Sequence, residues 1–127
     1  MKYIVDSKKP VEQAALDLQE AVKRHGFGVL HTYNLTETLK TKGAPIAQEC
    51  RILEICNPGQ AQKVLNADMS MNMALPCRVS VYEQDGTTRI GMISPKAMLG
   101  MLSDAPALAG VADQVEQSLR AMIDEAR

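Results

Sequence analysis

The strongest local constraint in the sequence is a pair of residues, Asp85-Gly86, that separates two apolar runs. The run "LPCRVSVYEQ" covers residues 75–84, and the run "TTRIGMIS" covers residues 87–94. An Asp-Gly pair in this setting is one of the clearest signals for a two-residue β-hairpin turn, because both central residues of that turn need a positive φ. The pair therefore predicts two neighbouring antiparallel strands.

Two long segments have the spacing of amphipathic helices. The first, residues 10–25, begins at Pro10 and stops before Gly26, and the second covers residues 106–126. Apolar residues recur along both segments at intervals of three and four, so each helix has a single apolar face. These residues are Val11, Ala14, Ala15, Leu18, Ala21 and Val22 in the first helix, and Leu108, Val111, Ala112, Val115, Leu119, Met122 and Ile123 in the second.

Three further segments, residues 2–6, 28–34 and 48–57, are predicted strands, and short helices separate some of the strands. Two helices with one apolar face each can both be buried if they lie on the same face of a sheet. We therefore predict a single α+β domain over residues 1–127, with one antiparallel sheet of about five strands in the order β-α-β4-α. Both long helices cover one face of this sheet, and the other face stays open.

The composition excludes several classes of protein. The net charge is -1, whereas general nucleic-acid binders carry a strong basic excess. One Phe, three Tyr and no Trp leave few rings for stacking on single-stranded nucleic acid. No apolar segment has the length of a signal peptide or a membrane span. We expect a cytoplasmic protein with no nucleic-acid or membrane partner, and an odd count of three cysteines argues against a disulfide framework there.

Three motifs carry a resemblance to a known family. They are "YNLTETLKTKG" at 33–43, "ILEICNP" at 52–58, and "LPCRVSVYE" at 75–83 followed by Asp-Gly. In this order they resemble the bacterial family called domain of unknown function 302. The resemblance implies a compact fold like one half of the TATA-binding-protein saddle, with one helix after the first strand and another after the fifth. It implies no established activity and no DNA binding, because a fold does not carry a function with it.

Alternation along the strands assigns side chains to the two faces of the sheet. Within 48–57, Leu53 and Ile55 point to one face, and Ile52, Glu54 and Cys56 point to the other. An unpaired carboxylate avoids a dry core, so Leu53 and Ile55 are predicted to face the helices. The same argument buries Cys77, Val79 and Val81 and places Arg78, Ser80 and Tyr82 on the open face.

The candidate ligand-binding residues on the open face are Glu54, Cys56, Arg78 and Tyr82. Glu54 and Arg78 form either a cross-strand pair or part of a ligand site. His31 is a further candidate, although its face is not assigned by the pattern, and a structural histidine is the alternative.

The three cysteines are expected to have different roles. Cys56 directly precedes Asn57-Pro58, a predicted helix start whose N–H groups favour a thiolate, and Arg78 is expected nearby. The alternative is that Cys56 is a small apolar residue at the end of a strand. Cys77 is expected to pack in the core and Cys50 to have no special role. Because Cys56 and Cys77 fall on opposite faces, no disulfide is predicted between them.

Other motifs give little chemistry. The sequence "MSMNM", with Met69, Met71 and Met73, is typical either of thioethers that bind a soft metal such as copper(I) or of side chains that fill gaps. No CxxC, HExxH, phosphate-binding glycine loop or GxSxG motif is present, so no metal site or cofactor is assigned and no recognisable enzyme is predicted.

Two hypotheses of function remain. The first is a small binding or sensor domain that holds a ligand or partner on the open sheet face. Because Ile52, Tyr82 and Ile93 would be exposed there, this hypothesis includes a homodimer. The second is a thiol protein that handles a sulfur species, a redox reaction or a soft metal through Cys56. The sequence names no substrate.

Overall fold

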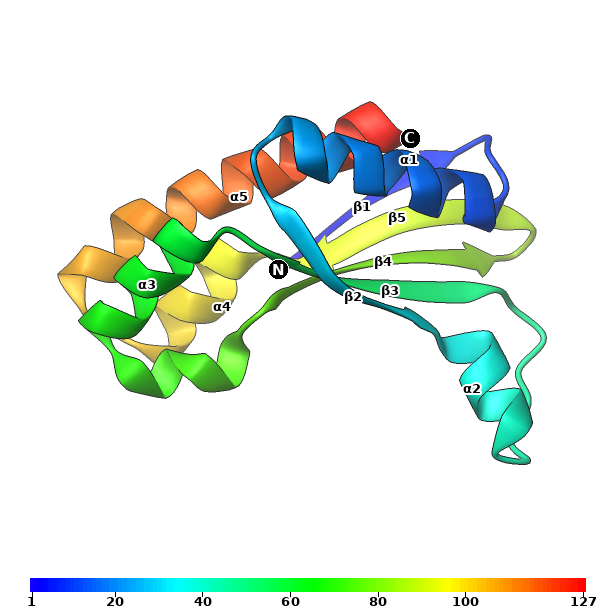
Figure 1. Ribbon diagram of the computed structural model, residues 1–127, viewed down its shortest axis with the longest axis horizontal. Coiled ribbons are helices and arrows are strands. Elements are labelled where there is room, and N and C mark those ends of the chain that lie inside the picture. The colour runs from blue at the N-terminus through cyan, green and yellow to red at the C-terminus, as the bar shows by residue number, and fades with distance from the viewer.

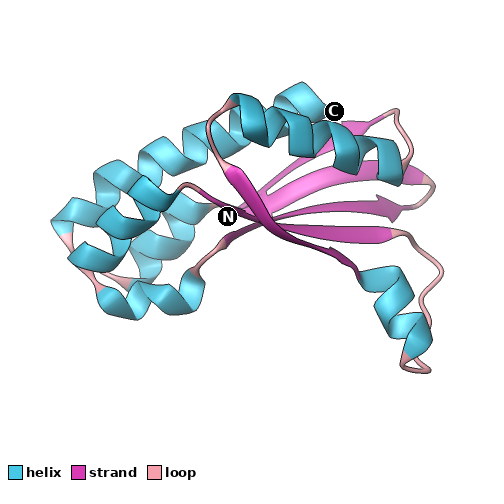
Figure 2. Cartoon of the chain, viewed as in Figure 1, coloured by secondary structure: helices cyan, strands magenta, loops and turns pink.

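The computed structural model describes residues 1–127, and Figure 1 and Figure 2 show its arrangement of helices and strands. The strands are β1 (Lys2–Ser7), β2 (Gly28–Asn34), β3 (Cys50–Cys56), β4 (Cys77–Gln84) and β5 (Thr87–Ile93). The helices are α1 (Val11–Arg24), α2 (Leu35–Thr41), α3 (Pro58–Ala67), the 3-10 helix η1 (Met69–Ala74), α4 (Pro95–Leu102) and α5 (Pro106–Ala126). None of the helices has the length and apolarity that a membrane crossing requires.

The five strands form one antiparallel sheet in the order β1-β5-β4-β3-β2. The predicted hairpin joins β4 to β5, and its last strand pair is Gln84 with Thr87. Asp85 has φ 52° and Gly86 has φ 77°, so both turn residues have the positive φ that this type of turn requires. The prediction of an α+β fold with a single open antiparallel sheet is confirmed.

Both long helices lie on the same face of the sheet, as predicted (Figure 1). Their apolar stripes meet the inward side chains of the strands in one cluster of buried residues, which includes Leu18 from α1 and Leu119 from α5. Leu53 of β3 and Val81 of β4 are fully buried on the sheet side of this layer. The alternation argument therefore assigned the two faces of these central strands correctly.

The short helices begin where the sequence places capping residues. The side chain of Asn34 accepts a hydrogen bond from the backbone N–H of Glu37 at the start of α2. Asn57 does the same for Gln60 at the start of α3, where Pro58 occupies the first turn. Residues 66–74 contain the end of α3 and the 3-10 helix η1.

The first half of α5 extends beyond the sheet and carries a group of short helices. α3, η1 and α4 gather around it at one end of the molecule, and α2 projects at the opposite end (Figure 1). At 21 residues α5 is about 30 Å long, which is enough to cover the sheet and also support this group. The open sheet face therefore lies between two projecting lobes.

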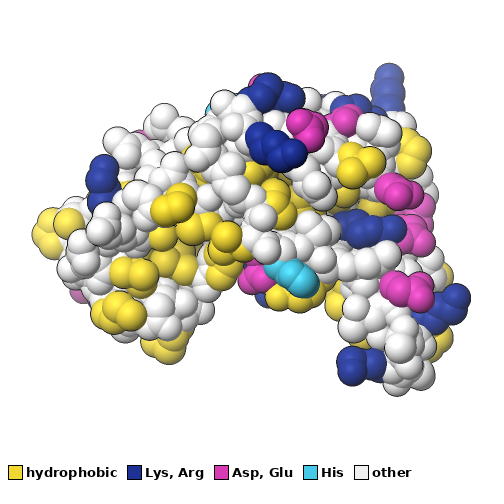
Figure 3. Space-filling view, in the orientation of Figure 1, with side chains coloured by type: hydrophobic (Ala, Val, Ile, Leu, Met, Phe, Trp, Pro, Cys, Tyr) yellow, Lys and Arg dark blue, Asp and Glu magenta, His cyan; other side chains and the backbone are white.

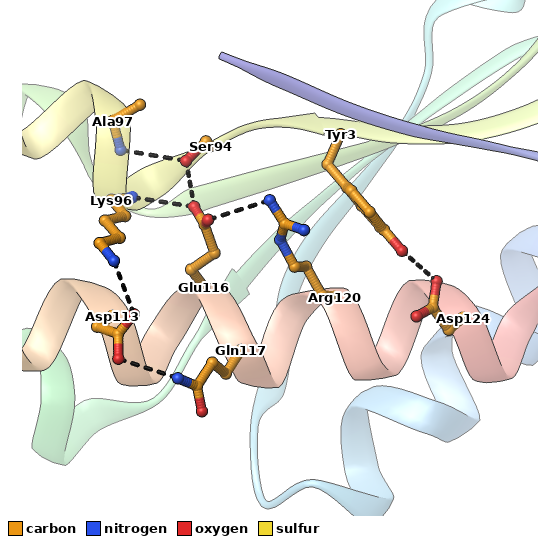
Figure 4. A network of polar contacts seen from close by, with 9 residues as sticks. All are labelled: Tyr3, Ser94, Lys96, Ala97, Asp113, Glu116, Gln117, Arg120 and Asp124. Atoms are coloured by element: carbon orange, nitrogen blue, oxygen red, sulfur yellow. Dashed lines mark hydrogen bonds and ion pairs between the residues drawn. The ribbon is translucent and has the colours of Figure 1, made fainter.

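A buried polar network fixes α4 to α5 (Figure 4). Ser94 is the N-cap of α4, and its hydroxyl accepts a hydrogen bond from Ala97 N at 3.1 Å. The same hydroxyl donates to the buried carboxylate of Glu116, which also accepts from Lys96 N at 3.3 Å and from the Arg120 guanidinium at 3.3 Å. A buried carboxylate is stable only with such donors, so the network specifies how the two helices meet.

The same face of α5 also holds the edge strand β1. The hydroxyl of Tyr3 donates to Asp124 at 2.5 Å, and the guanidinium carbon of Arg120 lies 4.5 Å from the centre of the Tyr3 ring. Arg120 therefore links this contact to the network around Glu116 (Figure 4).

We expect Ser94→Ala to lower the free energy of unfolding by about 1–3 kcal/mol, because it removes a helix cap and one of the three hydrogen-bond donors to the buried Glu116 carboxylate. Urea denaturation measures this change. Ser118→Ala on α5, the helix that carries Glu116, is the control and should stay within about 0.5 kcal/mol of the wild type. Equal stability of the two variants would contradict the role assigned to Ser94.

Candidate functional site

The open face of the sheet carries a cavity. Figure 3 shows the molecule hollowed between its two lobes, and the cavity lies on this face against η1 and the start of α4. Its volume is about 640 Å³, which is within the size range of small-molecule sites. We call it the sheet cavity.

The outward residues of the strands form its floor. Glu54 from β3 and Arg78 and Tyr82 from β4 all line the sheet cavity, together with Ile52 and Ile93. Ile93 is 54% exposed, and the ring of Tyr82 is half-buried. The structure thus brings together three of the five predicted ligand-binding residues, and it adds apolar surface beside them.

One glycine allows the edge strand β1 to approach this floor. Gly91 of β5 pairs with Ile4 on one side and with Ser80 on the other. A Cβ at position 91 would lie 3.0 Å from Ile4 Cγ1 and 3.2 Å from the Tyr3 carbonyl oxygen, which is closer than normal packing allows. The lack of a side chain lets Ile4 contribute to the cavity floor in its place.

The carboxylate of Glu54 is held by a residue of the neighbouring strand β2. It lies opposite His31 in the strand register, and its Oε1 accepts a hydrogen bond of 2.7 Å from the Tyr33 hydroxyl. This hydrogen bond is the main reason that the pKa of Tyr33 is raised. The rings of His31 and Tyr33 meet edge to face, with their centres 4.3 Å apart. His31 is therefore on the open face, exposed and next to the cavity, but it does not line it.

Tyr33 is the functional candidate that the sequence analysis missed. It is two residues from His31 on the same strand, so the face of one fixes the face of the other. The signal was weak because β2 has a register irregularity between Val29 and His31, which interrupts the alternation.

Arg78 has no charged partner in the chain. It pairs with Glu54 in the register of β3 and β4, but the two side chains form no ion pair. Of the two alternatives for these residues, the cross-strand position is therefore observed but an ion pair is not formed, because the Glu54 carboxylate turns to Tyr33. The Arg78 charge is still close enough to lower the pKa of Tyr33, which offsets part of the effect of Glu54. An exposed guanidinium is left at the edge of the cavity.

Cys56 was predicted on the open face of the sheet with Glu54, but it does not line the sheet cavity. It lines a second cavity of about 260 Å³ between the end of the sheet and α3, which we call the helix cavity. Cys77 lines the same cavity, so the prediction that the two thiols are separated by the sheet is wrong. Strand alternation fails here because Cys56 is the last residue of β3 and Cys77 the first residue of β4. Arg78 lines only the sheet cavity, so it does not share a cavity with Cys56.

The two cavities share a wall. Leu75, Pro76 and Cys77, which connect η1 to β4, line both of them. Cys77 is half-buried and packs against the core, as its phase with Val79 predicted. Burial, with a smaller contribution from the Cys56 thiol, raises the pKa of Cys77 to about 11. Burial also raises the pKa of Cys50.

The methionines do not act as a group. Met71 is buried in the core, whereas Met69 and Met73 are exposed. Gap filling therefore describes Met71, and Met73 contributes to the sheet cavity. No group of three or more His, Cys, Asp and Glu side chains is placed to hold a metal ion.

The comparison with protein families decides the relationship of the chain to known proteins. The model of "Domain of unknown function DUF302" matches residues 3–126. The chain belongs to the DUF302 family. A crystal structure of an uncharacterized conserved DUF302 protein from Bacillus stearothermophilus is 40% identical, and the match covers 99% of this chain and 98% of that one with a TM-score of 0.93. No curated protein matches. DUF302 membership thus confirms the resemblance seen in the motifs, and it assigns no activity.

We expect Cys77 of this DUF302 domain to resist iodoacetamide. The thiolate is the form that reacts. At pH 8, a thiol with a pKa of about 11 has a thiolate fraction roughly a hundredfold smaller than a thiol with a pKa of 9.0. Cys77 should label at least about a hundredfold more slowly in the native protein than in urea, and its rate should rise about tenfold per pH unit.

Among the three cysteines, Cys56 should label first, because it adjoins the N-terminus of α3. Peptide mass spectrometry assigns the sites, and early labelling of Cys77 would contradict the burial argument.

Proposed function

We propose that this protein is a small binding domain that holds a small amphipathic molecule with an acidic group in the sheet cavity. The observation that carries the proposal is the exposed Arg78 guanidinium, which lies without a charged partner beside an apolar floor. A guanidinium in this position is suited to bind a carboxylate, sulfonate or phosphate with two parallel hydrogen bonds.

The apolar part of such a molecule has a matching surface. Ile4, Ile52 and Ile93 supply branched side chains from three strands, and Met73 and Met98 supply flexible ones from the neighbouring helices. Ile4 is 43% exposed and Met73 82% exposed, so a ligand would remove considerable apolar surface from water.

Glu54 adds a requirement for the polar end of the ligand. Its carboxylate lies on the same floor as Arg78 and has one oxygen bonded to Tyr33. An anion bound to Arg78 is repelled by this carboxylate unless the ligand also offers a hydrogen-bond donor to it. The preferred ligand class is therefore an acid that carries a donor, such as an amine or hydroxyl, next to its acidic group.

The test uses 8-anilinonaphthalene-1-sulfonate, a fluorescent probe with a sulfonate, an N–H donor and an apolar ring system. We expect the wild type to bind this probe saturably, and Arg78→Gln to weaken binding by about tenfold or more, because a charge-assisted hydrogen bond contributes about 1.5–3 kcal/mol. Fluorescence titration of the folded proteins measures both affinities.

Lys63→Gln is the matched control, since Lys63 is an exposed cation on α3 that lines neither cavity. This variant removes the same charge and should bind the probe as the wild type does. Equal affinity of Arg78→Gln and Lys63→Gln would show that the probe does not use the sheet cavity.

The proposal includes a homodimer. The edge strand β2 has no buried residue, and an uncovered edge strand offers free backbone groups to a second copy of the chain. We expect the wild type to sediment as a dimer at high micromolar concentration, and Thr32→Lys on β2 to shift it to monomer. Thr38→Lys on α2, which is also an exposed position, should leave the dimer intact. A wild-type monomer under these conditions would refute the dimer.

A second candidate function is chemistry of the Cys56 thiol with a sulfur species, a redox partner or a soft metal. One observation favours it: Cys56 is half-buried and directly precedes Asn57, whose side chain caps α3. The N-terminus of a helix stabilises a nearby thiolate. If Cys56 labels with iodoacetamide no faster than an ordinary thiol, this candidate fails and the binding domain stands alone.

A further inference from the structure

The sheet is split at the end where the sheet cavity lies. The pairing of β4 with β5 ends at Ser80 and Gly91. Each strand continues beyond this point with its other neighbour, β4 with β3 as far as Cys77 and β5 with β1 as far as Ile93. The two strands therefore separate where β5 leads into α4 and β4 comes from η1 (Figure 1). The sheet cavity lies at this gap, because residues from both separated strand ends line it.

The charged side chains that line the cavity are two cations and one carboxylate, and the gap divides them. Arg78 and Glu54 are partners in the register of β4 and β3 on one side of the gap. Lys2 lies on the other side, where it is the partner of Ile93 in the register of β1 and β5. The register of β4 and β5, continued past its last pair, brings these two pairs opposite each other. The order across the open face is therefore Glu54, Arg78, Ile93 and Lys2.

Lys2 is a second cation without a partner. It shares the open face with Ile4, because Tyr3 between them turns to Asp124 of α5. The Lys2 side chain is exposed and forms no ion pair. Like Arg78, it can therefore offer its full charge to a bound anion.

The surface between the two cations is apolar. β5 lies between β1 and β4, so at least two strand spacings, about 10 Å, separate the backbones of Lys2 and Arg78. Ile93 lies in this interval and is 54% exposed. A molecule that matches the whole row has an apolar middle and an acidic group at each end.

We propose that the ligand of the sheet cavity is an amphipathic diacid, in which a second acidic group pairs with Lys2. This inference rests on the proposed function and adds Lys2 as the residue that selects among acids. The first acidic group pairs with Arg78, and the donor beside it meets the Glu54 carboxylate. The apolar chain lies over Ile93 and carries the second acidic group to the Lys2 ammonium.

The experiment compares two amino acids, 2-aminosuberate and 2-aminooctanoate. They have the same chain length and the same α-amino and α-carboxylate groups, and they differ only at the far end, which is a carboxylate in the first and a methyl group in the second. Isothermal titration calorimetry measures both affinities at pH 7 and low salt, because salt screens charges near the surface.

The proteins are the wild type, Lys2→Gln, Lys2→Arg and Lys8→Gln. Lys8 is the matched control, because it is also exposed and without an ion pair but lines neither cavity. Circular dichroism confirms that each variant is folded before titration.

We expect the wild type and Lys8→Gln to bind 2-aminosuberate about fivefold more tightly than 2-aminooctanoate, which is the upper range for one exposed ion pair. Lys2→Gln should abolish this preference and change the affinity for 2-aminooctanoate by less than about twofold. Lys2→Arg keeps the charge and should retain the preference.

Equal affinity of the wild type for the two probes would overturn the diacid and leave the proposed function intact, whereas binding of neither probe would overturn both. A preference that persists in Lys2→Gln would also overturn the inference, because another group would then hold the second carboxylate. L-Glutamate tests the span, since its two carboxylates are too close together to reach from Arg78 past Ile93 to Lys2. If Lys2→Gln weakened glutamate as much as 2-aminosuberate, the extended arrangement would be wrong.

Discussion

The layer of apolar side chains between the sheet and the two long helices decides where the rest of the chain lies. Leu18, Leu53, Val81 and Leu119 are completely removed from water in this layer, and burial of such side chains is the main favourable contribution to folding. The chain has only two helices long enough to cover a sheet, and both are used on one face. The opposite face must therefore meet solvent, a ligand or another chain, and every candidate for function on the sheet follows from this asymmetry.

The length of α5 has a second effect. Its C-terminal half covers the sheet beside α1, and its N-terminal half supports α3 and α4 beyond the sheet end (Figure 1). Glu116 is placed between these two halves, where its buried carboxylate receives Ser94 from the start of α4 (Figure 4). The lobe that borders both cavities is thus attached to the same helix that completes the core.

Local sequence signals predicted the fold because each of them is set by neighbours in the chain. Asp85-Gly86, the caps Asn34 and Asn57, and the stripes of the long helices all depend on residues within a few positions. The alternation of Leu53 against Glu54 assigned the faces of the central strands for the same reason. The candidate site was predicted in part: Glu54, Arg78 and Tyr82 were placed on one floor, whereas the partner of Glu54 was not.

What the sequence left undetermined depends on strand ends and on contacts between distant segments. The position of Cys56 beside Cys77 arises where β3 has ended and the chain has turned into α3, so periodicity no longer applies. Tyr33 was missed because the irregular register of β2 hides its phase. The two cavities themselves are enclosed by side chains from η1, α3 and α4, whose packing on α5 no short-range pattern specifies.

The wall formed by Leu75, Pro76 and Cys77 means that neither cavity has a boundary of its own. A displacement of this segment toward the sheet floor takes volume from one cavity and gives it to the other. Two ligands that press on the wall from opposite sides then oppose each other even though they never touch. By thermodynamic reciprocity, the factor by which the first weakens the second equals the factor by which the second weakens the first.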